Sequence, residues 1–115
     1  FLAREAFAQT AADLLASVQA ALYDQAHARR EANITRDIAG FDDLATHFAE
    51  ERRYPGWAEV QWARPSGAGL DAVVERLKAL KLTFRNVPIA AAPADGACLF
   101  SGAPAVERIL VARAY

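Results

Sequence analysis

Residues 98–115 read CLFSGAPAVERILVARAY, and this stretch says more about the fold than any other part of the sequence. A cysteine and two apolar residues lead into Gly102 and Pro104, which are typical of a turn. The residues from 106 to 112 are mainly apolar and rich in Val and Ile, which predicts a strand. We therefore expect the chain to end in two short strands, 97–100 and 106–112, joined by this turn.

The composition limits the class of protein. The 115 residues fit one domain with its own core, and a hydrophobic content of 54% excludes a disordered tail. A net charge of −1 and a pI near 6.1 give no basic surface for tight nucleic-acid binding. The single cysteine excludes an intrachain disulfide. No apolar run approaches the roughly 18 residues of a membrane helix, and the N-terminus does not resemble a signal peptide. We therefore expect a cytoplasmic protein with no membrane partner.

The N-terminal third reads as helical. Residues 1–33 contain no glycine or proline, and their apolar side chains recur at helical spacing. The side chains concerned are Leu14, Leu15, Val18, Leu22 and Tyr23. A second, short helix is predicted after Gly40, with Phe41, Leu44 and Phe48 on one face. Because the first residues read as the middle of a helix, we expect the chain to be a piece of a longer polypeptide.

The remaining two thirds alternate between strand and helix patterns. The predicted elements are a strand at 57–62, a helix at 70–80, a strand at 82–87 and the two terminal strands. Trp57 and Trp62 fall at odd and even positions of one strand, so one of them is expected in the core. The order predicts an α+β fold in which N-terminal helices precede a two-layer α/β sandwich with a small mixed sheet.

Several short motifs follow one another along the chain. They are LASVQAALY at 15–23, EANIT at 31–35, FDDL at 41–44, GWAEVQW at 56–62, TFRNVP at 83–88 and the ending at 98–115. Their order resembles the C-terminal part of archaeal/eukaryotic-type prolyl-tRNA synthetases, whose ending reads roughly C-x-x-C-G-x-P-A before a strand that closes in A-[KR]-[AS]-Y. The resemblance implies a topology like the C-terminal domain of initiation factor three. It also implies that residues 1–36 form a linking helix from an absent anticodon-binding domain, and that residues 37–115 form the C-terminal domain.

The same resemblance implies what the whole enzyme does. It would be a homodimeric class II ligase that activates proline with ATP and Mg²⁺ and esterifies it to its tRNA. This segment would be non-catalytic and need no cofactor, would pack on the catalytic core, and would meet tRNA only through that enzyme. Tyr115 would reach toward the active site. A free-standing α+β interaction module is the alternative, and a third reading, an RNA-binding domain, is disfavoured by the acidic pI.

Zinc-bearing members of this family hold a structural zinc ion with cysteines. The corresponding positions here are Ala63, the neighbourhood of Ala68, Cys98 and Ser101, and the family's Cys-Gly pair appears as Ala63-Arg64. A structural zinc site needs four ligands, nearly always Cys or His. Only Cys98 remains, so the resemblance predicts a degenerate site without zinc.

Other candidate sites are weaker. His27 and His47 lie far from Cys98 in sequence, so Cys98 lacks a nearby base and is interpreted as a buried lone cysteine rather than a nucleophile. Six arginines are candidates for contact with a tRNA backbone, although ordinary surface roles are favoured for them. They are Arg29, Arg30, Arg36, Arg52, Arg53 and Arg64.

Overall fold

The computed structural model of the chain describes residues 3–49 and 54–114. The chain divides into two compact units, residues 1–32 and residues 33–115, and the two are described separately below. Within the described residues, no helix combines the length and apolar character that a membrane span requires.

The first unit is one helix, α1 (Arg4–Ala32), as the sequence predicted. Its 29 residues include no helix breaker, and Arg29 and Arg30 lie in the last turn, where cations complement the helix dipole. None of its residues is buried. The exposed large apolar side chains are Phe7, Leu14, Leu15, Val18, Leu22 and Tyr23. The apolar side chains of α1 are therefore not buried by other residues of the first unit.

The second unit is a four-stranded sheet with two helices. Its elements are β1 (Ile34–Thr35), α2 (Phe41–Ala49), β2 (Trp57–Trp62), α3 (Gly67–Ala79), β3 (Leu82–Phe84) and β4 (Glu107–Arg113). The strand order is β1-β2-β4-β3, with β1 parallel to β2 and the other neighbours antiparallel. The predicted α+β class with a small mixed sheet is confirmed.

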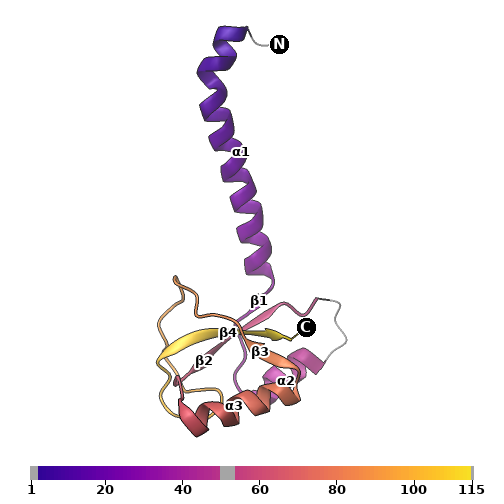
Figure 1. Cartoon of the computed structure of the whole chain (residues 1–115), viewed down its shortest axis with the longest axis vertical. Coiled ribbons are helices and arrows are strands. Elements are labelled where there is room, and N and C mark those ends of the chain that lie inside the picture. Colours follow the sequence, from indigo (N-terminus) through magenta and orange to yellow (C-terminus); the bar gives the residue numbers. More distant parts are fainter. Residues whose placement is uncertain (1–2, 50–53, 115) are drawn as a thin grey trace. The chain divides into compact units, whose positions relative to one another are not determined.

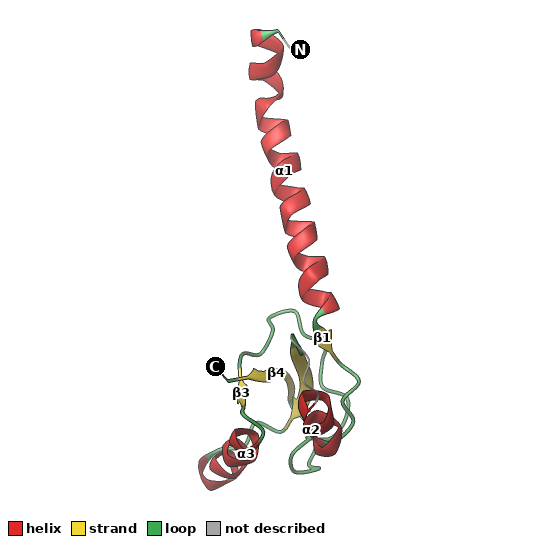
Figure 2. Cartoon of the chain, turned by 90° about the vertical axis from the view of Figure 1, so that its right-hand side faces the viewer, coloured by secondary structure: helices red, strands yellow, loops and turns green. Residues whose placement is uncertain are grey.

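The core lies between one face of this sheet and the two helices, which lie on the same side of it (Figures 1 and 2). Alternate residues of β2 face the helices, which is why Ala58, Val60 and Trp62 are all buried. The core residues that they meet come from four other elements: Leu44, Phe48, Val73, Leu77, Leu82, Ile109 and Val111. Trp62 is 8% exposed and Trp57 is 37% exposed, so Trp62 is the tryptophan of the core.

Four predictions about the elements of the second unit differ from the structure. No strand forms at 97–100; only an isolated bridge joins Ala97 and Pro104, because this segment closes a tight turn. The strand predicted at 82–87 ends at Phe84, where Arg85 and Asn86 both bond to Leu110 and form a bulge. The third helix begins at Gly67 rather than residue 70, and Gly67 enters it with a left-handed φ of 55° that glycine adopts easily. Finally, β1 was missed because two residues carry no periodic signal.

Candidate functional site

The turn at residues 98–103 and the end of β2 bring together Cys98, Ser101 and Ala63, three of the four positions that the family resemblance assigns to zinc ligands. The Cys98 N–H donates to the Ala103 carbonyl at 2.6 Å, and the Gly102 N–H donates to the Cys98 carbonyl at 2.9 Å. The Cys98 sulfur accepts hydrogen bonds from the Ser101 hydroxyl and from the backbone of Ala63. Ala68 is exposed in the first turn of α3.

These contacts set the ionisation of the only cysteine. Cys98 is 4% exposed, and burial by itself raises the pKa of its thiol. Hydrogen bonds from the Ser101 hydroxyl and from the backbone of Phe100, Ala63 and Ser101 act in the opposite direction and bring the pKa below its ordinary value. The turn thus directs several donors at one sulfur, and together they outweigh the effect of burial on the pKa of its thiol.

A second turn, directly after β2, has an unusual backbone conformation. Arg64 has a φ of 49°, a left-handed value that glycine adopts easily and other residues avoid at a cost of about 1–2 kcal/mol. Gly102, in the facing turn, has a φ of 75°. Both residues stand where the family resemblance places a glycine after a cysteine. Both turns therefore use a left-handed residue at this point, although Arg64 is not a glycine.

Glu107, at the start of β4, holds Arg64 in this conformation. The Arg64 guanidinium donates to Glu107 through Nε at 2.8 Å and through Nη2 at 2.6 Å. The indole Nε1 of Trp62 donates to the same carboxylate at 3.0 Å. The hydrogen bond from Arg64 is the main cause that holds the pKa of Glu107 below its ordinary value, and the same pair raises the pKa of Arg64. Sequence reasoning missed Glu107, since its partners lie about 45 residues earlier in the chain.

The residues at these four positions do not fit a zinc ion. Two are alanines, which offer no ligand, so Cys98 and Ser101 supply at most two of the four ligands that a structural site needs. Within residues 3–49 and 54–114, no group of three or more His, Cys, Asp or Glu side chains is placed to hold a metal ion.

Hydrogen bonds hold the C-terminal strand in place as far as Ala114, the last described residue. The Ala114 N–H donates to the Lys81 carbonyl at 2.8 Å, and Arg113 Nη2 donates to the Phe48 carbonyl at 2.6 Å. The Arg85 guanidinium donates to the Arg113 carbonyl. Tyr115, the candidate for an active-site role, lies outside the described residues.

The six arginines considered for tRNA contact have diverse surroundings. Arg64 pairs with Glu107, and Arg36 lies 3.5 Å from the buried carboxylate of Glu59. Arg52 and Arg53 lie outside the described residues, whereas Arg29 and Arg30 are exposed on α1. The structure does not gather these six side chains into one described cluster.

Comparison with known proteins shows that this α+β domain is similar to part of the proline–tRNA ligases. The chain is 65% identical over 109 residues to a proline–tRNA ligase of Sphingomonas elodea, covering 95% of this chain and 21% of that protein. It is 57% identical over 115 residues to a proline–tRNA ligase of Sphingopyxis alaskensis, covering 100% of this chain and 21% of that protein. The chain thus spans about a fifth of the length of the curated relatives that it matches. No protein-family profile matches it.

A solved structure shows the same fold. Prolyl-tRNA synthetase of Giardia lamblia, in complex with prolyl-adenylate, matches with a TM-score of 0.67 at 21% identity, over 92% of this chain and 21% of that one. The fold is thus that of an α+β domain that this synthetase also contains. The chain belongs to the proline–tRNA ligase family and corresponds to a C-terminal segment of those proteins, as the order of its motifs predicted.

Proposed function

We propose that this chain is the non-catalytic C-terminal domain of a proline–tRNA ligase that uses ATP and Mg²⁺ to attach proline to its tRNA. One observation carries the proposal: 95% of the chain matches a proline–tRNA ligase at 65% identity while spanning 21% of that protein. The sequence contains no ATP-binding motif and no nucleophile beside a base, which supports a non-catalytic role. The catalytic core of the same enzyme is the partner, tRNA is met only through that enzyme, and the whole enzyme is a cytoplasmic homodimer.

Residues 1–36 act as the linking helix in this proposal, and residues 37–115 as the domain proper. At about 100° per residue, five large apolar side chains of α1 fall on one stripe about 100° wide. They are Phe7, Leu14, Leu15, Val18 and Leu22. Each is between 48% and 67% exposed, so this stripe offers a face for the anticodon-binding domain that precedes the helix in the whole enzyme.

In this proposal the domain supports and positions the strand that leads to Tyr115. The strand that leads to Tyr115 is central in the sheet, and its end is held by the contacts of Arg113 and Ala114. If the whole enzyme also ends at Tyr115, a strand held in this way can present the carboxylate and ring of that residue at one place on the catalytic core, whereas most chain ends fray.

The activity test uses the full-length protein and the 115-residue chain side by side. We expect proline-dependent exchange of pyrophosphate into ATP from the full-length protein and none from residues 1–115. Exchange by the fragment would contradict the non-catalytic role. A full-length protein that is inactive with proline, or a gene that encodes little beyond these residues, would instead favour the free-standing interaction module.

We also infer that the turns around Cys98 and Arg64 are the remnant of a zinc site that no longer binds metal. We expect elemental analysis of the purified chain to find no zinc, and a strong chelator to leave its melting temperature unchanged. The Cys98→Ser variant is the matched control, and its metal content is expected to equal that of the original chain. One zinc per chain would contradict the inference, because removing a structural zinc costs on the order of 10 kcal/mol and would lower the melting temperature steeply.

A further inference from the structure

The face of the sheet opposite the helices carries a loop of unusual composition. Residues 87–94 read VPIAAAPA, and we call this segment the apolar loop. Pro88 is buried, and the Ala91 N–H donates to its carbonyl at 3.1 Å, which closes a turn around Ile89. Ile89 is 106% exposed, the highest exposure among the large apolar side chains described, and Val87 is 40% exposed. The loop thus places its largest side chain fully in solvent.

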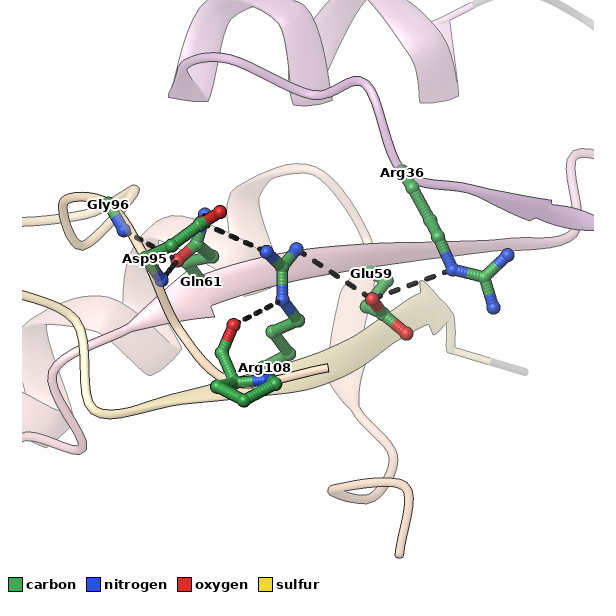
Figure 3. A network of polar contacts seen from close by, with 7 residues as sticks. Arg36, Glu59, Gln61, Asp95, Gly96 and Arg108 are labelled. Atoms are coloured by element: carbon green, nitrogen blue, oxygen red, sulfur yellow. Dashed lines mark hydrogen bonds and ion pairs between the residues drawn. The ribbon is translucent and has the colours of Figure 1, made fainter. Parts of the chain in front are cut away.

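Polar contacts fix the C-terminal end of this loop to the sheet. Gln61 Oε1 accepts from the N–H groups of Asp95 and Gly96 at 2.8 and 3.0 Å, and Gln61 Nε2 donates to the Asp95 carboxylate at 2.9 Å (Figure 3). Arg108 Nη2 donates to the same carboxylate at 3.0 Å, and Arg108 Nε donates to the Pro93 carbonyl at 3.2 Å. We call Gln61, Asp95 and Arg108 the clasp.

A buried charge orients the clasp. Glu59, on β2, is 5% exposed, and its Oε1 lies 3.9 Å from Arg108 Nη1 and 3.5 Å from Arg36 Nε (Figure 3). Burying a carboxylate is costly unless cations accompany it, so this pairing fixes the Arg108 side chain in one position. Arg108 in turn is only 15% exposed. A buried ion pair therefore helps to hold this loop against the sheet, although Ile89 itself contributes nothing to the core.

We propose that the apolar loop is a docking element whose Ile89 inserts into an apolar recess on the part of the proline–tRNA ligase that lies outside this chain. The loop carries no charge from residue 87 to 94, so it fits a protein surface and not the phosphates of a nucleic acid. The relatives are about five times longer than this chain, which provides a large partner surface within one polypeptide. An exposed aliphatic anchor on a loop whose C-terminal end is already held loses less conformational entropy on docking. This inference rests on the proposed function.

The first experiment places a photo-crosslinking benzoylphenylalanine at position 89 of the full-length protein. We expect irradiation to yield crosslinks within one polypeptide, between position 89 and residues outside this chain, mapped by mass spectrometry. Crosslinks to a second copy of the protein, crosslinks only to added tRNA, or none at all would each overturn the proposal. Aminoacylation is measured on the same sample. An active enzyme without the crosslink refutes the docking loop alone, whereas an inactive one with the crosslink refutes the proposed function alone.

A pair of variants tests the energetic role of Ile89. In the full-length protein we expect amide hydrogens of the apolar loop to exchange at least about tenfold more slowly than in the 115-residue chain. Ile89→Asp is expected to abolish this protection, because a carboxylate in an apolar recess is unpaired. The control is Val106→Asp, which alters a side chain that is 59% exposed and is not part of the loop, and the protection is expected to persist. Equal exchange rates in the full-length protein and in the 115-residue chain would refute the proposal. An equal loss of protection in both variants would also refute it.

Discussion

Removal of Tyr115 from the full-length proline–tRNA ligase is expected to lower its aminoacylation rate at least about tenfold. The residues before it are tied to the sheet, since Ala114 bonds to Lys81 and the Arg113 guanidinium bonds to Phe48. In an enzyme that ends at this tyrosine, a strand end supported in this way can hold a fixed carboxylate near the substrate site, where an anion orients a cationic group or a loop. A partly buried, charge-assisted hydrogen bond contributes about 1.5–3 kcal/mol, which corresponds to roughly tenfold or more in rate.

A short C-terminal extension provides the matched comparison for this deletion. It keeps the ring of Tyr115 but moves the carboxylate, so a similar loss of rate is expected if the carboxylate matters. The melting temperature of the 115-residue chain is expected to change little in either variant, because the core lies elsewhere. If both variants charge tRNA at the original rate, the terminus has no role in the reaction.

The second large effect is expected at Gly56, which begins the GW motif before β2. Its φ is +71°, and an added Cβ would lie 2.2 Å from the Asn33 carbonyl oxygen. That oxygen also accepts the Trp57 N–H at 2.9 Å, in the contact that starts the pairing of β1 with β2. Gly56→Ala therefore forces the backbone apart and adds left-handed strain, and we expect a loss of about 2–4 kcal/mol in the free energy of unfolding.

For a domain of this size, such a loss corresponds to a fall of at least about 10 °C in melting temperature, measured by circular dichroism. Gly40→Ala is the control, because a Cβ there would meet nothing within 4 Å and the backbone is not left-handed. We expect this control to melt within about 2 °C of the original chain. Equal melting temperatures for the two variants would show that the approach of Gly56 to Asn33 is not required.

Part of the candidate site could be predicted from the sequence. The family resemblance grouped Ala63, Cys98 and Ser101, and the structure does place Ala63 and Ser101 against the Cys98 sulfur; their origin as zinc positions stays a prediction. The hydrogen bonds between Glu107 and Arg64 could not be predicted. A glutamate in a strand resembles any solvent-facing residue until its partner strand is known. The same holds for Glu59, whose burial depends on Arg36 and Arg108 from other segments.

The sequence by itself determined the long helix, the strands at 57–62 and near 106–112, the α+β class and the family. These follow from periodicity and motif order, which are local properties recorded residue by residue. Only the tertiary structure decided the two-residue strand β1, the bulge that ends β3 and the turn in place of a strand at 97–100. It also decided that Trp62 rather than Trp57 enters the core. The physical reason is common to all four: each depends on hydrogen-bond partners or burial supplied by segments far away in the chain, which no local pattern records.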